Sequence, residues 1–170
     1  EGGLTNTGGR YNPATDTWTP VSIGAGVPGP RYVHHAVWTG TEMIVWGGTN
    51  IGSYLNSGGR YDPVNDVWTP TSTGANVPSV RIRGTMIWTG SEAIVWGGFS
   101  GATSLDTGGR YRPATDSWEP TPTGPNTPSA RWRHSAVWTG SEMIVWAGDQ
   151  GANTGGRLVP GSGGFLCNDG

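Results

Sequence analysis

The sequence has 170 residues, which suits one domain of ordinary size, and its 31 glycines and 13 prolines make a fraction more typical of low complexity. Ten tryptophans argue against disorder, because disordered chains rarely carry so many large apolar side chains. The formal charge is −2 and every basic residue is an arginine, which argues against a basic surface for nucleic acid or anionic lipid. No apolar run approaches the roughly 18 residues of a membrane span, so we expect no membrane insertion.

The start of the chain and its cysteine usage set further limits. The sequence opens at Glu1 rather than at a methionine, so we expect a processed product or a piece of a longer protein. The single cysteine, Cys167, excludes an internal disulfide framework and a zinc site built on cysteines.

A repeat with a step of 50 residues runs through the chain. The tetrapeptide Gly-Gly-Arg-Tyr begins at positions 8, 58 and 108. Three series of tryptophans keep the same step, at positions 18, 68 and 118, at 38, 88 and 138, and at 46, 96 and 146. Only Trp132 stands outside these series. Such a period is typical of an array of structural repeats.

Within one unit, residues 31–80, we predict four short strands separated by turns. The first is Val33–Trp38, and the second, Met43–Trp46, closes with a glycine pair that indicates positive φ or a close neighbouring backbone. The third is centred on Arg60 and the fourth on Trp68, with a turn rich in Asp, Asn and Pro between them. Glycine and proline are too frequent for helices, and no stretch carries a 3.6-residue apolar period.

The apolar pattern of the strands selects the architecture. The first two strands of a unit are apolar without alternation, which indicates that both of their faces are covered. Radial stacking of four-stranded sheets meets this requirement, whereas a β-sandwich predicts one wet face per strand and no strict 50-residue period. The fold class we predict is therefore all-β, a β-propeller built of four-stranded blades.

The repeat resembles the kelch repeat, whose unit is about 50 residues long. The matching positions are Arg31, His34, Ala36–Trp38, Ile44–Gly48, Tyr61 and Trp68. The pattern departs at Gly84, which replaces the histidine, and at Leu158, which replaces the tyrosine. The resemblance covers nearly the whole chain and implies kelch-like blades.

Counted in blades, the chain is expected to hold about 3.5 of them. We expect residues 1–20 to form a half blade of third and fourth strands, 21–70 and 71–120 to form blades, and 121–170 to form a degenerate last blade with a tail. Propellers close with four to eight blades, so this arc needs completion. The expected partner is another copy, closing a ring of six or seven blades, or the remainder of a longer chain. In one form of closure, the half blade completes the sheet near residues 131–147.

Function on such a scaffold is expected on the longer loops. Arg31, Arg81 and Arg131 precede the first strand of each unit, and Arg83 and Arg133 lie two residues further on. Converging guanidinium groups can grip a carboxylate or another anion. Because every unit carries the first arginine, we favour a structural role between blades for those three, and Arg83 and Arg133 are the better ligand candidates.

Aromatic residues surround these arginines in the sequence. Tyr32 and Trp132 flank them and offer flat surfaces for a sugar or another ring, and Tyr54 and Phe99 lie on the loops that follow the second strand. These four residues complete the set of aromatic ligand candidates.

Histidines at equivalent positions, His34 and His134, raise the possibility of a metal. No third ligand recurs beside them, and Gly84 breaks the series. We therefore favour histidines that pack in an inner strand and bond to the next blade, keep them only as ligand candidates, and expect no metal and no cofactor.

The repeated acidic residues are assigned to turns. Asp16, Asp66 and Asp116 are predicted to cap the turn between the third and fourth strands, and Glu42, Glu92 and Glu142 to belong to hairpin turns. The sequence holds no nucleophile elbow and no phosphate-binding loop. Residues that recur in every blade are poor catalytic candidates, because chemistry needs an asymmetric group of side chains, so we expect no enzyme.

Three hypotheses of function remain. The first is a non-enzymatic binding or assembly module of an exported or cell-surface bacterial protein, with a protein or glycan ligand. The second is a carbohydrate-binding, lectin-like propeller that uses Trp132, Tyr32, Tyr54 and Arg133. The third is a structural subunit of an extracellular polymer, since near-identical repeats with open ends can join head to tail.

Overall fold

The computed structural model describes residues 3–149, 153–160 and 165–166, and every described strand belongs to one of four antiparallel sheets. β1 (Gly9–Asn12) and β2 (Thr17–Pro20) form a two-stranded sheet. The first four-stranded sheet holds β3 (His35–Trp38), β4 (Met43–Trp46), β5 (Gly58–Asp62) and β6 (Val67–Pro70). The second holds β7 (Thr85–Trp88), β8 (Ala93–Trp96), β9 (Gly108–Arg112) and β10 (Ser117–Pro120). The third holds β11 (Ser135–Trp138), β12 (Met143–Trp146), β13 (Gly155–Leu158) and β14 (Phe165–Leu166).

The predicted all-β fold class of four-stranded kelch-like blades, about 3.5 per chain, is confirmed. Each four-stranded sheet is a meander in which consecutive strands pair. In the first blade Trp46 pairs with Gly58, and in the second Trp96 pairs with Gly108, one repeat later. The prediction about Cys167 lies outside the described residues.

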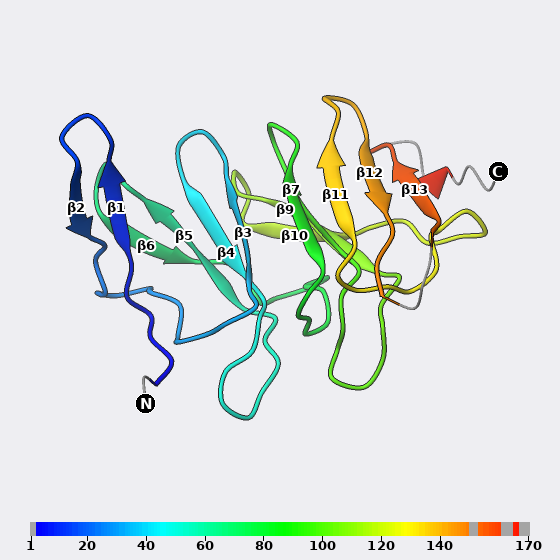
Figure 1. Cartoon of the computed structure of the whole chain (residues 1–170), viewed down its shortest axis with the longest axis horizontal. Helices are drawn as coiled ribbons and strands as arrows, with labels where there is room; N and C mark the ends of the chain where they lie inside the picture. The colour runs from blue at the N-terminus through cyan, green and yellow to red at the C-terminus, as the bar shows by residue number, and fades with distance from the viewer. Residues whose placement is uncertain (1–2, 150–152, 161–164, 167–170) are drawn as a thin grey trace.

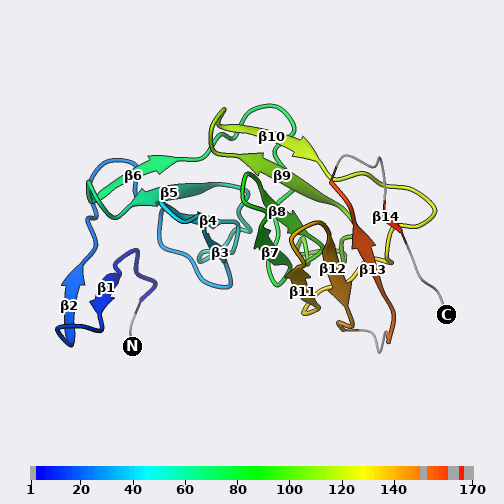
Figure 2. The same cartoon turned by 90° about the horizontal axis from the view of Figure 1, so that it is seen from above.

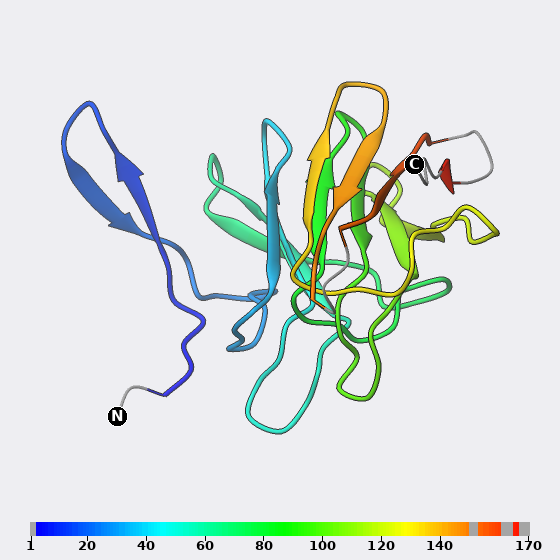
Figure 3. The same cartoon turned by 45° about the vertical axis from the view of Figure 1, so that its right-hand side comes forward.

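The blades follow one another along an arc (Figure 1). The first strands β3, β7 and β11 contact one another in that order and lie on the concave side, whereas β6 and β10 lie on the convex side (Figure 2). The short hairpin turns gather at one end of the blades and the long loops after β4 and β8 at the other (Figure 1). The β1–β2 hairpin stands at one end of the arc (Figure 3).

The first strand of each blade begins later than predicted. It starts at His35 rather than Val33, because Val33 has a φ of 49°, in the left-handed region that breaks a strand. Arg83 and Arg133 occupy the same position in the next two blades, each with a φ of 56°. The predicted positive φ of the glycine pair is confirmed, with 72° at Gly47 and 88° at Gly48.

The hydrophobic core lies between blades rather than inside one sheet. Trp46 and Ile44 of β4 pack against Ala93, Val95 and the aromatic side chains of β9 and β10. The same arrangement recurs one blade later, where β8 packs against β12 and β13. Both faces of β8 are therefore buried, as its unbroken apolar sequence predicts.

Only some of the tryptophans pack between blades. Trp46 and Trp96 are fully buried, but Trp18, Trp38 and Trp146 are 69%, 54% and 56% exposed. These three lie at the two ends of the arc, where no blade of the described chain packs against them. No helix long and apolar enough to span a membrane occurs among the described residues.

Candidate ligand-binding surface

The arginines that recur at the start of every blade bind backbone carbonyls. Arg81 is 1% exposed, and its guanidinium donates to the carbonyl oxygens of Ser79, Gly97 and Thr107 at 3.1, 3.1 and 2.7 Å. Burial lowers the pKa of Arg81 to about 10.

The other two members of this series make matching contacts. Arg31 donates to the carbonyl oxygens of Gly47 and Ser57, and Arg131 to those of Ala147 and Thr154. Arg81 and Arg131, both 1% exposed, do not face a ligand surface, and the guanidinium of Arg31 is engaged in the same way. These arginines instead tie the loop after the second strand of a blade to the start of its first strand.

The two histidine candidates are separated by the structure. His134 is buried, and its ring lies 5.2 Å from that of Trp96 in the preceding blade. His34 is exposed near the start of the arc. The neighbouring His35, by contrast, is buried and lies 3.3 Å from the Trp46 carbonyl. No group of three potential metal-binding side chains occurs among the described residues.

Three of the aromatic candidates form a row across the long-loop side of the arc. The ring centroids of Tyr54 and Phe99 lie 6.5 Å apart, and those of Phe99 and Trp132 lie 5.8 Å apart. The loop at Gly101 passes close beneath the Tyr54 ring, where a Cβ would lie 2.5 Å from a ring carbon. Because each ring comes from a different blade, the blade stacking itself builds the row.

Two guanidinium groups lie over the last ring of this row. The Cζ atoms of Arg83 and Arg133 are 5.0 and 4.4 Å from the centroid of the Trp132 indole, within cation–π range. The Arg133 side chain is 54% exposed and pairs weakly with Asp149 at 3.4 Å. The amide of Arg133 donates to the Arg83 carbonyl at 2.8 Å, which fixes the two side chains beside each other.

The structure thus brings five predicted residues together and leaves the others apart. We call the five the aromatic–arginine row, and its members are Tyr54, Arg83, Phe99, Trp132 and Arg133. Tyr32 is 51% exposed, but its backbone pairs with Thr49 and the structure gives its ring no contact with the row. The positive φ of the two arginines is shared by Val33 at the same position of the first blade, so it is a feature of the repeat rather than of the row.

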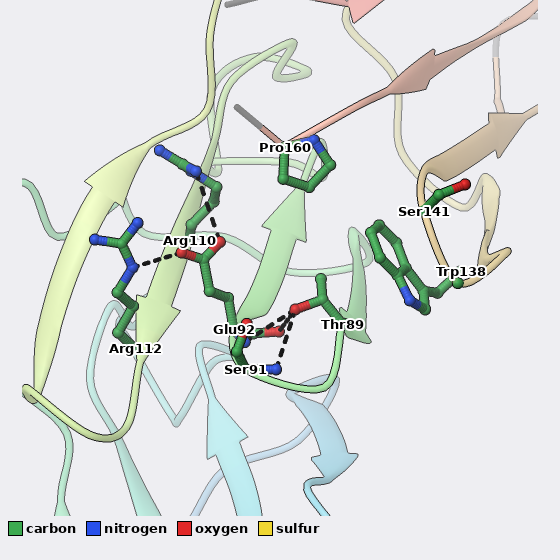
Figure 4. A pocket seen from close by; sticks show the side chains of 9 residues that line it. Thr89, Ser91, Glu92, Arg110, Arg112, Trp138, Ser141 and Pro160 are labelled. Carbon is green, nitrogen blue, oxygen red and sulfur yellow. Dashed lines mark hydrogen bonds and ion pairs between the residues drawn. The ribbon is translucent and has the colours of Figure 1, made fainter. Parts of the chain in front are cut away.

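A second concave region, which the sequence analysis missed, lies on the hairpin-turn side between the second and third blades. Its volume is about 420 Å³, and it is lined by Glu92, Arg110 and Arg112 on one side and by Trp138 and Pro160 on the other. Figure 4 shows both arginines converging on the Glu92 carboxylate. Mutual pairing leaves these charges largely satisfied, so this region offers a ligand less than the row does.

The ion pairs of that region explain the hairpin-turn glutamates. Arg110 pairs with Glu92 at 3.6 Å and with Glu119 at 2.6 Å, and Arg112 pairs with Glu92 at 2.5 Å. Equivalent pairs join Glu42 to Arg60 and Glu142 to Arg157. The signal for them was the hairpin-turn glutamate, which precedes the arginine of Gly-Gly-Arg by 18 residues in the first two blades and by 15 in the last.

The aspartates of the turns between third and fourth strands do not cap those turns, contrary to our prediction. Asp66 accepts a hydrogen bond from the Tyr61 hydroxyl and one from the Ser22 amide, which lies 44 residues away before the blade. These bonds lower the pKa of Asp66. The turn is capped instead by Asp62, which accepts from the Val64 amide at 2.7 Å. The prediction failed because the carboxylate of Asp66 is taken up by the Tyr61 hydroxyl and the Ser22 amide, whereas Asp62 bonds the amides of the turn.

Comparison with known proteins identifies the repeat. The family model described as the KLHDC2/KLHL20/DRC7 kelch-repeats domain matches residues 1–156. The chain belongs to this kelch family. Kelch-repeat domains are generally non-catalytic and typically bind proteins, and an incomplete kelch arc of this kind suggests completion by other copies or chain parts. No curated protein matches the kelch chain in a sequence comparison.

Proposed function

We propose that this chain is a non-enzymatic kelch binding module that holds a segment of a partner protein on the aromatic–arginine row. The observation that carries the proposal is the pair of guanidinium groups over Trp132, at the end of a row of rings that spans three blades. Large rings and arginines dominate the binding energy of protein interfaces. A rigid scaffold that presents them on variable loops is a typical recognition surface.

The charges of the row indicate the chemistry of the segment. Arg83 and Arg133 place two positive charges beside Trp132, and Asp149 offsets one of them. A segment with a carboxylate next to a flat apolar or aromatic side chain would meet both features, by bidentate pairing to an arginine and by stacking on the indole. The ring of the propeller is completed in this proposal by further kelch blades, from another copy or from a longer chain.

The proposed location is outside the cell or at its surface. Low charge, the lack of lysine and the richness in glycine and tryptophan support this location. Secretion of the native protein with detection in the culture medium or on intact cells tests it, and retention inside the cell would contradict it.

Variants that copy the other blades test the binding surface with little risk to the fold. Ile82 stands in the second blade where Trp132 stands in the third, and Val33 stands in the first where Arg83 stands in the second. We therefore choose Trp132→Ile and Arg83→Val, with Tyr32→Ile as the matched control outside the row. Peptides selected on the native chain from a random display library, measured by fluorescence anisotropy, supply the ligands.

Each row variant is expected to weaken peptide binding at least about tenfold, which corresponds to roughly 1.4 kcal/mol. The Tyr32→Ile control is expected to bind as the native chain does. Equal affinity of Trp132→Ile for the selected peptides would contradict the proposal. A glycan array measured in parallel distinguishes peptide binding from the lectin-like hypothesis. Glycan binding without peptide binding would identify the row as a carbohydrate-binding site.

A further inference from the structure

The last blade ends the arc with an apolar face that no other blade of the described chain covers. Ile144 and Trp146 of β12 are 37% and 56% exposed, and Val137 of β11 is 56% exposed. Their counterparts in the first blade, Ile44 and Trp46, are fully buried against the second blade. This end of the arc is therefore built to receive a further blade.

The opposite end carries the outer half of such a blade. The β1–β2 hairpin docks on the first blade as β5–β6 docks on the second, because Arg10 donates to the Pro63 carbonyl at 2.5 Å just as Arg60 donates to that of Pro113 at 3.2 Å. The hairpin thus takes the third and fourth strand positions of a blade. Among the described strands, none takes the first or second position of this blade, so β1 and β2 form a sheet of two strands (Figure 3).

An apolar cavity lies where those two inner strands would pack. It has a volume of about 310 Å³ and is lined in part by Met43, Val45 and Trp68 of the first blade and by Gly8 at the start of the hairpin. Trp38, which pairs with Met43 in the first blade, is 54% exposed, whereas its counterparts Trp88 and Trp138 pack against the cores between blades.

Gly8 gives an independent sign that a strand belongs beside the hairpin. At the equivalent residues Gly58, Gly108 and Gly155, a Cβ would collide with the carbonyl oxygen of the valine on the adjacent second strand. At Gly8 a Cβ would meet nothing closer than Val21, at 3.9 Å. The contacts within this chain therefore leave room for a side chain at Gly8, and a strand in the second position would remove that room.

We propose that two copies of this chain close a six-bladed ring by exchanging strands at both ends. β11 and β12 of one copy lie beside β1 and β2 of the second and form a composite blade, while β13 and β14 leave β12. The register follows that of β4 with β5, so that Trp146 pairs with Gly8 and Ile144 with Arg10 of the other copy. This inference rests on the proposed function only in taking the arc to be completed by further kelch blades.

The sequences of the strands favour a second copy as the occupant. β12 reads Met-Ile-Val-Trp, the same as β4, whose partner β5 belongs to a Gly-Gly-Arg-Tyr segment. β1 belongs to such a segment too, whereas β13 ends in Leu158 in place of the tyrosine. Among the described residues, β13 pairs with two residues of β14, and β1 pairs with all four residues of β2. Exchange gives β12 a partner that keeps the tyrosine of the repeat and is paired along its whole length with β2.

The exchange also covers the exposed rings at both ends. Trp146 of one copy enters the cavity toward Trp68 of the other, as Trp46 lies 5.0 Å from Trp118 within the chain. Trp18, now 69% exposed, meets Trp96 of the first copy. Glu142 gains Arg10 of the other copy as its ion-pair partner in place of Arg157. Each copy supplies two whole blades and half of each composite blade, which gives six around a two-fold axis.

A disulfide between strands of different copies tests the register. In a Cys167→Ser background, Arg10→Cys with Ile144→Cys places one thiol on each of two residues that face each other across the proposed composite blade. Mild oxidation is expected to give a covalent species of two chains. The control pair, Asn12→Cys with Ile144→Cys, lies two residues out of register and is expected to stay uncrosslinked. Crosslinking of the control alone, or a ladder of longer species, would overturn the closed two-copy ring.

Sedimentation velocity of the native chain and of Gly8→Ala tests the assembly without a crosslink. The native chain is expected to sediment as a dimer, at twice the 17.8 kDa mass of one chain. Gly8→Ala is expected to sediment as a monomer of 17.8 kDa. Gly3→Ala is the control that should stay dimeric, because a Cβ at Gly3 would meet no other atom within 4 Å. Circular dichroism checks that the monomeric variant stays folded. A native chain that remains monomeric at micromolar concentration would overturn the exchange. If the native chain is monomeric, its affinity for the selected peptides still tests the proposed binding surface, so the two proposals can fail independently.

Discussion

The Nε2 atom of His134 in the third blade lies 2.8 Å from the hydroxyl oxygen of Thr85 in the second. Burial, with the charge of Arg131 as a smaller cause, lowers the pKa of His134 to about 4. Burial also lowers the pKa of His35, at the interface between the first and second blades, to about 4. Both blade interfaces therefore contain an imidazole that is neutral in the folded protein at neutral pH.

This arrangement predicts a loss of stability in mild acid. A histidine whose pKa falls on folding contributes stability that is complete above its unfolded pKa near 6.5 and is lost as the pH drops toward 4. Each histidine can account for up to about 3 kcal/mol over this range. We expect thermal unfolding followed by circular dichroism to show a melting temperature that falls steadily between pH 6.5 and 4.

The double variant His35→Thr, His134→Gln is the control for this prediction. Thr85 stands at the position of His35 in the second blade, so threonine is accepted there. The variant is expected to lose much less of its melting temperature than the native chain between pH 6.5 and 4. Carboxylates with a lowered pKa, such as Asp66, begin to cost stability at about pH 5, but they are the same in both chains, so the difference between the chains reports the two histidines. An unchanged slope in the double variant would show that other groups cause the acid sensitivity.

Two arginines only two residues apart are predicted to differ sharply in their effect on stability. Arg81→Ala removes a buried guanidinium, takes the side-chain donor from the Gly97 carbonyl and leaves the Thr107 carbonyl with only the Gly97 amide, which should cost on the order of 3 kcal/mol. Arg83→Ala removes a cation over an indole and should cost less than about 1 kcal/mol. Urea unfolding followed by tryptophan fluorescence measures both, and equal losses would contradict the structural role of Arg81.

The hydrogen bonds of Asp116 predict a further contrast. Its Oδ1 accepts from the Tyr111 hydroxyl at 2.6 Å and from the Ser72 amide at 2.9 Å, which joins the second blade to the chain before it. Asp116→Ala should cost about 1–2 kcal/mol, because two donors lose a charged acceptor at an exposed site where water replaces part of the interaction. Asp116→Asn keeps an acceptor oxygen and tolerates the φ of 46°, so it should cost less than half as much.

Asp16→Ala is the matched control for the Asp116 variants. The exposed Asp16 accepts only the Tyr11 hydroxyl, at 2.7 Å, among the hydrogen bonds of the described residues. Its replacement should change the free energy of unfolding by less than about 1 kcal/mol. A loss as large as that of Asp116→Ala would mean that the inter-blade bond from Ser72 contributes nothing.

The repeat makes most of this fold predictable from the sequence. Glycine and tryptophan recur at a fixed step because each is needed at the same place in every blade, as the pairing of Trp46 with Gly58 and of Trp96 with Gly108 illustrates. The start of the first strand was predicted two residues too early, at Val33 instead of His35. Nothing in the sequence marks Val33 as a left-handed residue, a conformation unusual for a β-branched side chain.

The candidate site was less predictable than the fold. The residue types of the aromatic–arginine row could be proposed, but Tyr54, Phe99 and Trp132 occupy different positions of the repeat, so aligned units do not show that they meet. An arginine that follows a loop can point to solvent or to the backbone. The sequence favours a backbone-binding role for Arg81 only because an arginine recurs there in every unit. The hydrogen bonds of Arg81 to the Gly97 and Thr107 carbonyls establish that role.

The last blade offers a substitution that should stabilise the protein. Ala147 has a φ of 59°, at the position where Gly47 and Gly97 stand in the earlier blades with φ values of 72° and 65°. A Cβ in this region costs roughly 1–2 kcal/mol, so Ala147→Gly should raise the free energy of unfolding by about 1 kcal/mol once the greater freedom of the unfolded chain is included. The reverse change, Gly97→Ala, should destabilise by more, because its Cβ would lie 2.5 Å from the ring of His134. Urea unfolding of both variants checks the pair, and a destabilised Ala147→Gly would show that the backbone at this turn is relaxed with alanine in place.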